Sequence, residues 1–159
     1  MENIIKQNKK RLKSDVITEA HIKGGMSYKE YRGLIEQLLI GGQTTGENQS
    51  AAMIDYTRNN VQRMNRLDSR IVLDDLLLMT LHSLKNDWYW VVLTEAWSGD
   101  AAENIPILAK IASATPRIRM KLLLRDEYPE IFNHYTAENN KSIPLLICLT
   151  QEELVELGT

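Results

Sequence analysis

The segment Trp97-Ser98-Gly99-Asp100-Ala101 contains the residues whose types could do chemistry. Ser98 would be a nucleophile if His82 or His134 acted as its general base, because a serine hydroxyl needs a positioned base before it can attack. A general base must lie within hydrogen-bond reach of the serine, and neither histidine lies at a recognisable sequence spacing from Ser98. We therefore interpret Ser98 as a hydroxyl that caps the start of a helix.

Two carboxylates, Asp100 and Glu103, follow directly and could form an acid/base pair. The run Asp-Ala-Ala-Glu is also a common start of a helix, where acidic side chains interact favourably with the positive end of the helix dipole. We favour this structural role for both carboxylates over a catalytic one.

The sequence has a single cysteine, Cys148. One thiol cannot complete a dithiol–disulfide cycle within one chain, and it excludes an internal disulfide and a Cys-rich zinc site. Because Cys148 lies in an apolar run, we predict a core position and not a reactive thiol. The three histidines are scattered, so the sequence indicates no metal site and no cofactor.

The composition is that of a soluble globular protein, with 43% hydrophobic and 25% charged residues. A net charge of -2 over 159 residues gives no general attraction to nucleic acid or to anionic membranes. The N-terminus lacks the apolar core of a signal peptide, and no apolar run approaches the ~20 residues that span a bilayer. We expect a cytoplasmic protein that contacts neither nucleic acid nor membrane.

The first 85 residues have a helical pattern. The capping box Ser27-Tyr-Lys-Glu30 predicts a helix that ends at Gly41-Gly42, and Ser50 predicts the start of a longer one. A third, mostly buried helix is expected around residues 74–84. Four arginines lie on or near one face of the longer helix, and they either recognise an acidic partner or phosphate or, as we favour, form its solvated side: Arg58, Arg63, Arg66 and Arg70.

From residue 86 the pattern alternates between strands and helices. The aromatic and β-branched run WYWVVLT predicts a strand that is buried on both faces. The order β-α-β-α-β-β predicts a mixed sheet whose first pairs are parallel. The expected strands are 88–94, 119–124, 143–149 and 152–157, and the expected helices are 101–113 and 127–135.

Order and spacing in this part resemble the thioredoxin family. In that family a strand ends in Trp-Cys-Gly-Pro-Cys, where this sequence has Trp97 to Ala101; the following helix carries a proline, here Pro106; and a cis proline, here Pro144, precedes a later strand. The stretch from Thr94 to Ala102 is similar to a branch with the motif Trp-Cys-Gly-Asp-Ala-Ala. Arg125-Asp126-Glu127 also fits that branch. The resemblance covers roughly residues 86–158.

The resemblance implies that three chemical roles are vacant. Ser98 stands at the position of the family's nucleophilic cysteine, and Ala101 stands at that of the resolving cysteine. The family's buried carboxylate on the first strand corresponds here to Val92. A helix dipole alone cannot generate a serine alkoxide near pH 7, so we expect no dithiol oxidoreductase activity.

These observations predict an α/β fold: a thioredoxin-like domain at residues 86–159, with a central mixed sheet of about four strands, preceded by a helical extension at residues 1–85. Thioredoxin folds normally end with a helix that covers one sheet face, and this sequence stops just after the last expected strand. Either the N-terminal helices take its place or the natural protein is longer. An uncovered apolar face would promote dimerisation or aggregation.

Two functions remain open. The first is a non-catalytic module that binds a peptide, a protein or a small anion at Trp97, Ser98, Gly99, Asp100, Ile143 and Pro144. In this hypothesis Trp97 is an exposed anchor, although a structural role is equally consistent with its position. The second is a single-thiol oxidoreductase in which Ser98 replaces the nucleophilic cysteine.

Overall fold

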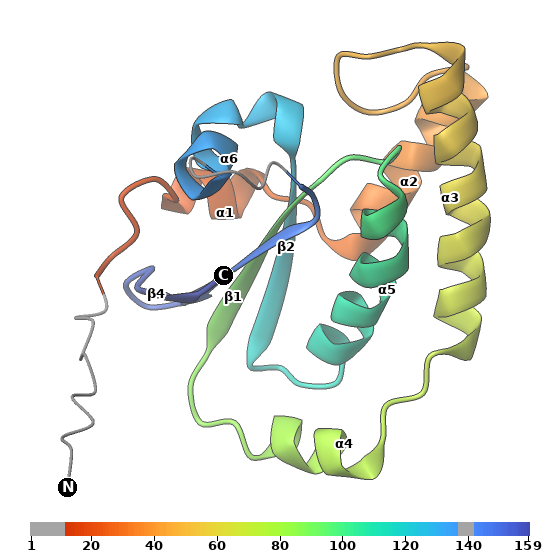
Figure 1. Cartoon of the computed structure of the whole chain (residues 1–159). Helices are drawn as coiled ribbons and strands as arrows, with labels where there is room; N and C mark the ends of the chain where they lie inside the picture. The colour runs from red at the N-terminus through yellow and green to blue at the C-terminus, as the bar shows by residue number, and fades with distance from the viewer. Residues whose placement is uncertain (1–11, 137–141) are drawn as a thin grey trace, which may run out of the picture.

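The computed structural model describes residues 12–136 and 142–159. Its centre is a four-stranded sheet of order β2-β1-β3-β4 (Figure 1). The strands are β1 (Trp88–Thr94), β2 (Ile118–Leu124), β3 (Leu145–Thr150) and β4 (Glu156–Gly158). The predicted α/β class and the mixed four-stranded sheet are therefore confirmed.

The strand directions correct one detail of the sequence prediction. β1 and β2 are parallel, as expected for two strands joined by a helix, but β3 pairs antiparallel with β1 and with β4. The chain enters β3 at Pro144, next to the carboxyl end of β1, so it must run back along β1. The Ile143–Pro144 peptide bond is cis.

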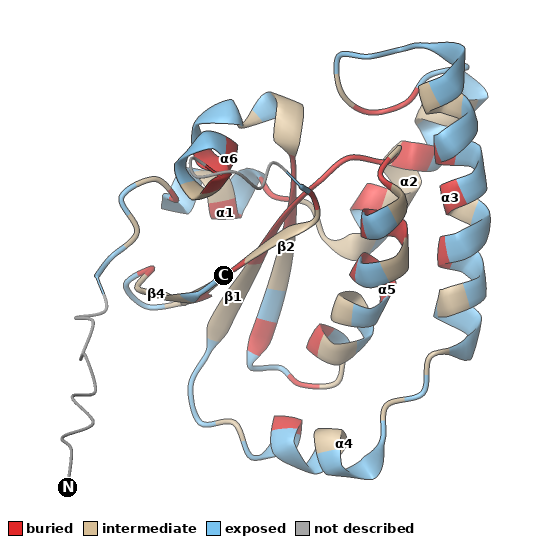
Figure 2. Ribbon diagram, in the orientation of Figure 1, coloured by how far each residue is buried: buried red, intermediate tan, exposed pale blue. Residues whose placement is uncertain are grey.

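Each face of the sheet is covered by different helices. Helix α5 (Gly99–Ser113) packs on one face, where Val92 and Leu122 meet Ile105. The helices α1 (Glu19–Gly24), η1 (Arg125–Glu127) and α6 (Pro129–Thr136) lie on the other side, where Val91 and Ile147 form the main core (Figure 1). Burial is nearly complete along the second half of β1 (Figure 2).

The N-terminal helices begin where their caps predict. In α2 (Tyr28–Ile40) the Ser27 hydroxyl accepts the Glu30 N–H, and the Glu30 carboxylate accepts the Ser27 N–H, which completes the capping box. Ser50 caps α3 (Ala51–Arg70), which packs along α5. The expectation of a mostly buried third helix is wrong: in α4 (Asp75–His82) only Leu81 is buried, because one side of this two-turn helix meets the protein.

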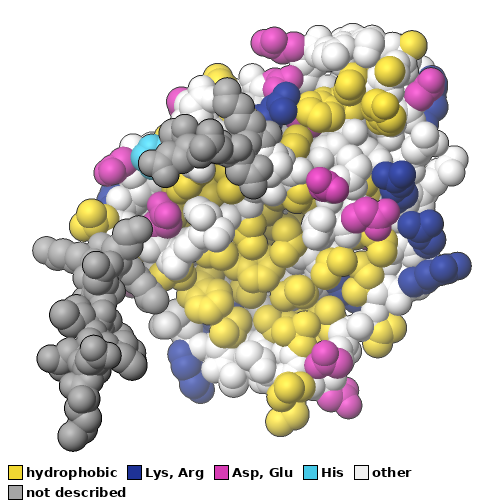
Figure 3. All heavy atoms as spheres, in the orientation of Figure 1, with side chains coloured by type: hydrophobic (Ala, Val, Ile, Leu, Met, Phe, Trp, Pro, Cys, Tyr) yellow, Lys and Arg dark blue, Asp and Glu magenta, His cyan; other side chains and the backbone are white. Residues whose placement is uncertain are grey.

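The half of the α5-bearing face that lies over β1, β3 and β4 is not covered by a described helix. The N-terminal helices α2 and α3 lie beyond α5, on the side of β2, and do not replace a covering helix (Figure 1). Apolar side chains spread over this half (Figure 3). Cys148 is among them and is half-buried, which corrects the prediction of a core position. None of the described helices has the length and apolar character to cross a membrane.

Candidate functional site

Ser98 is the N-cap of α5. Its Oγ accepts a hydrogen bond from the Ala101 N–H at 3.2 Å and donates one to the Ile143 carbonyl at 3.3 Å. The residue is 8% exposed. Among the described residues no basic side chain contacts this hydroxyl; His82 belongs to α4 and His134 to α6. The capping interpretation is confirmed, and the hydroxyl proton is already used.

Residues that are far apart in sequence meet at the turn between β1 and α5, which contains Ser98. The Ser98 hydrogen bond brings the start of α5 against Ile143, and Pro144 then leads into β3. Ile143 is buried, whereas Ser142 is exposed and Pro144 is half-buried. The structure therefore brings the predicted binding residues Ser98, Ile143 and Pro144 into one neighbourhood.

Trp97 is only half-buried, and one of its faces is occupied. The Arg125 guanidinium lies 4.9 Å from the ring centroid, a cation–π distance. Its Nε donates a hydrogen bond to Asp126 Oδ1, and its Nη2 lies 2.8 Å from the same oxygen in an ion pair. The Trp97 indole Nε1 is buried and has no hydrogen-bond partner among the described residues. Trp97 thus has a structural role, and its part in binding a partner stays a prediction.

Glu95 is a functional candidate that the sequence reasoning missed. It follows β1 directly and is fully buried, and its Oε1 accepts the Asp126 N–H at 2.9 Å. Burial raises the pKa of this carboxyl group, and the nearby Asp126 charge raises it further, against the lowering effect of the Thr45 hydrogen bond. Val92 lies in the apolar core, and a buried acid follows three residues later. The available signal was a glutamate directly after a buried strand.

The loop between α2 and α3 and the first half of α3 form hydrogen bonds with the turn between β1 and α5. The Thr45 hydroxyl accepts the Ala96 N–H at 2.7 Å, and the Asn60 amide donates to the Ala96 carbonyl at 2.8 Å. Both groups are buried, so the backbone of Ala96 is fully satisfied by the helical extension. The residues before 86 therefore help to build the site.

Gly46 allows the loop between α2 and α3 to approach the turn between β1 and α5 closely. Its φ is +80°, and a Cβ at this position would lie 2.5 Å from Asp126 Oδ2, 3.2 Å from Glu95 Oε2 and 3.3 Å from Trp97 Nε1. A side chain would collide with the acids that hold the turn, and the left-handed backbone also favours glycine. Glycine is therefore required at position 46 by the contacts with the site as well as by the conformation of the loop.

Two hollows flank the turn. One, of about 460 Å³, lies between α3 and the turn and is bordered by Met53, Tyr56 and Arg63. The other, of about 430 Å³, lies between α5 and the entry to β3 and is bordered by Ile107 and Pro144. The exposed side chain of Asp100 borders both, so together they form an interrupted groove across the start of α5.

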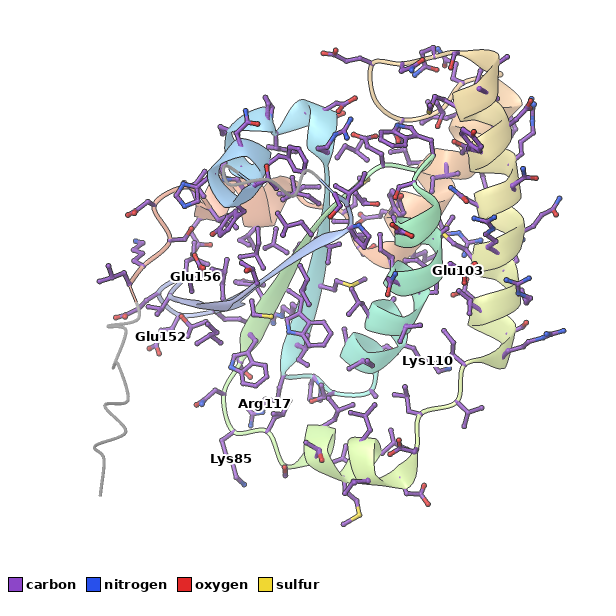
Figure 4. All side chains as sticks on the ribbon, viewed as in Figure 1. Lys85, Glu103, Lys110, Arg117, Glu152 and Glu156 are labelled. Carbon is purple, nitrogen blue, oxygen red and sulfur yellow. The ribbon has the colours of Figure 1, made fainter. Side chains whose placement is uncertain are left out.

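The arginine face of α3 is partly paired with α5. Arg63 Nε and Arg66 Nη2 lie 3.9 and 3.6 Å from Glu103 Oε1, and the three side chains are about half exposed (Figure 4). Exposed pairs of this kind contribute little to stability. Glu103 is therefore directed toward α3, which supports its structural role over an acid/base pair with Asp100. Within the described ranges no group of acidic, histidine or cysteine side chains could hold a metal ion.

A family model described as Thioredoxin matches residues 46–159. The chain belongs to this thioredoxin family. The fold is also similar to that of a protein of unknown function, PA1234, from Pseudomonas aeruginosa, with a TM-score of 0.61 and 19% identity over 89% of this chain and 75% of that one. An HIV epitope scaffold is similar to the same extent in all four measures. No curated protein matches the chain.

In this thioredoxin-family chain the hydroxyl of Ser98 is hydrogen-bonded and Ala101 is 1% exposed. That these two residues stand at the family's thiol positions stays a prediction. The family match begins inside the segment that the sequence analysis assigned to the helical extension. The division at residue 85 and the narrower branch with Trp-Cys-Gly-Asp-Ala-Ala stay predictions.

Proposed function

We propose that this thioredoxin-like chain is a non-catalytic, cytoplasmic binding module that holds an extended peptide segment of a partner protein across the start of α5. The observation that carries the proposal is the pair of hollows that meet at the exposed side chain of Asp100. One hollow offers apolar contacts near Pro144, and the other offers the Arg63 guanidinium and the Tyr56 ring. A peptide that crosses Asp100 would use both.

The absence of catalysis is part of this proposal and follows from the groups at the turn. The Ser98 proton is directed at the Ile143 carbonyl, and Ala101 offers only a methyl group. Binding needs neither a thiol nor a general base, so a groove with Ser98 and Ala101 in place of cysteines can still bind a peptide. The Trp97 ring, held by Arg125, would form a rigid wall of the groove.

A phage-displayed library of random peptides tests the proposal. Peptides enriched on the parent chain should bind Asp100→Lys at least about tenfold more weakly, because one reversed charge touches both hollows. Asp75→Lys is the matched control, since Asp75 is an exposed acid in the first turn of α4, away from the groove. Failure to enrich any peptide, or equal binding by both variants, would contradict the proposal. Competition by inorganic phosphate but not by peptide would favour a small anion as the ligand.

One observation favours the second candidate, a single-thiol oxidoreductase with Ser98 in place of cysteine. The Ser98 Oγ lies at the N-terminus of a 15-residue helix and accepts a backbone N–H there. A thiolate at this point would receive the same stabilisation, which is how a helix N-terminus lowers the pKa of a thiol.

The comparison of Ser98→Cys with Ser50→Cys, both in a Cys148→Ala background, tests this candidate. Ser50 caps α3 but is exposed, so it reports what a helix N-terminus does alone. If the site retains an activating environment, the thiol at 98 should titrate well below the unperturbed value of ~8.5 and below the thiol at 50. An ordinary pKa at position 98, or a serine codon there in the natural gene, would count against inherited redox chemistry.

A further inference from the structure

The uncovered half of the sheet, which we call the open sheet face, is formed by Trp88 and Trp90 of β1, Leu146 and Cys148 of β3, and Leu157 of β4. These side chains are half-buried and surround a hollow of about 550 Å³. Strand pairing places them on one side of the sheet, since Trp90 is opposite Cys148 and Trp88 is opposite Thr150. Figure 3 shows a broad continuous apolar area over this half of the sheet.

The extent of this area indicates a protein partner. It continues from the sheet toward α5, because Leu146 also borders the hollow that contains Ile107, and Ile107 is 38% exposed. The apolar area extends beyond the hollow within it and reaches α5, so it offers more surface than a small ligand in that hollow would cover (Figure 3). Contiguous apolar surface with partly exposed aromatic side chains is typical of the centre of a protein interface.

Charged side chains of both signs border the open sheet face (Figure 4). Glu152 lies on the side of β4, and Lys85, Arg117 and Lys110 lie along the ends of β1, β2 and α5. Glu156 is directed away from this face, because it accepts a hydrogen bond from Tyr135 of α6 on the other side of the sheet. Arg117 is paired with Asp87 at 3.0 Å. In the described part of the chain neither lysine forms an ion pair. Lys85 and Glu152 border the same hollow at the lower end of the sheet.

We propose that the open sheet face binds a second copy of this chain in a two-fold symmetric dimer. In such an interface the same patch serves both partners, so a contact from Lys85 to Glu152 occurs twice. A two-fold axis that passes through the hollow between these residues brings Lys85 of each copy toward Glu152 of the other. The tryptophans of both copies would then form the dry centre, surrounded by complementary charge. The open sheet face adjoins the groove at Ser98 through Leu146, but the dimer does not require a peptide to bind there.

Sedimentation velocity over a wide range of chain concentrations tests the dimer, and charge reversal tests its geometry. Lys85→Glu and Glu152→Lys should each raise the dissociation constant by about tenfold at low salt, because each change places like charges at two equivalent contacts. The double variant should restore most of the affinity. Lys29→Glu, at an exposed position on α2, makes the same charge change away from the face and should have no effect.

A second variant addresses the apolar centre. Leu157→Glu, near the end of the short strand β4, should abolish the dimer while the far-ultraviolet circular dichroism stays that of the parent. A monomer at all concentrations would overturn the proposal, and so would a dimer that neither the charge reversals nor Leu157→Glu weakens. A monomeric chain that binds a synthetic amphipathic helix or a fatty acid at this face would overturn it in favour of that occupant.

Discussion

Glu95 is a buried carboxyl group at the end of β1, beside the candidate site. One carboxylate oxygen accepts the Asp126 N–H, and the other has no partner among the described residues. Burial is the largest influence on its pKa and raises it, and the Asp126 charge adds to the rise. The Thr45 hydroxyl, the Asp126 N–H and the Arg125 charge lower it by less. The folded protein therefore holds this proton to higher pH than the unfolded chain does.

This shift predicts a pH-dependent stability difference between the parent and Glu95→Gln. Below the unfolded pKa both states are protonated and no penalty exists; as pH rises through the folded pKa, the parent must bury a charge and loses stability. The gain in the free energy of unfolding from Glu95→Gln should thus be larger at pH 7 than at pH 4. Urea unfolding at both values measures it, and a pH-independent difference would show that the carboxyl group is not desolvated.

The structural roles of single residues at the site differ in how well they could be predicted from the sequence. The cap at Ser98 could be predicted because capping depends on the next three residues alone. The burial of Glu95 could not, because it depends on Thr45 and Asp126, which are distant in the chain. The indole of Trp97 is covered in the same way by Arg125.

The loop between α2 and α3 is the element that joins the helical extension to the site. It presents Thr45 to the Ala96 N–H, and its Glu47 N–H donates to Asp126 at 2.9 Å. Gly46 is packed between these contacts with a positive φ. The geometry of the turn at Ser98 therefore depends on an element fifty residues away in sequence.

Alanine substitutions at two glycines of this loop distinguish the free-energy cost of backbone strain from that of a steric clash. Gly42 also has a positive φ, of +68°, but no atom lies within 4 Å of where its Cβ would be. Gly42→Ala should therefore cost about 1 kcal/mol through strain alone, whereas Gly46→Ala should cost about 2–4 kcal/mol because its Cβ meets Asp126 and Glu95. Chemical denaturation followed by tryptophan fluorescence gives both values. Equal losses would mean that the loop yields without disturbing the site.

Elements were predictable where local signals determine them. Ser27 and Ser50 start their helices as expected, and β1 was evident from its aromatic and β-branched run. The exposure of α4 and the direction of β3 were not predictable from local patterns, because both depend on what lies beside them in the folded chain. The same limit explains why the contact of Gly46 with the site was missed.

At the scale of the whole molecule, half of the α5-bearing face of the sheet has no covering helix among the described residues. The family and the mixed sheet could be inferred from the order and spacing of motifs, but the position of α2 and α3 could not. Their packing beyond α5 leaves Trp88 and Trp90 at the surface. A dimer would bury these rings, which are otherwise costly to expose to water.

Cys148 provides a direct measure of this burial. It lies within the open sheet face, and partial burial already raises the pKa of its thiol, so reaction with a thiol reagent should be slow near neutral pH. If two copies cover the face, the second-order rate constant should fall further as the chain concentration rises through the range of dimer formation. In Leu157→Glu the rate constant should not depend on concentration. A parent rate constant that is equally independent of concentration would mean that Cys148 stays accessible, and the open sheet face would then not be the surface through which two copies associate.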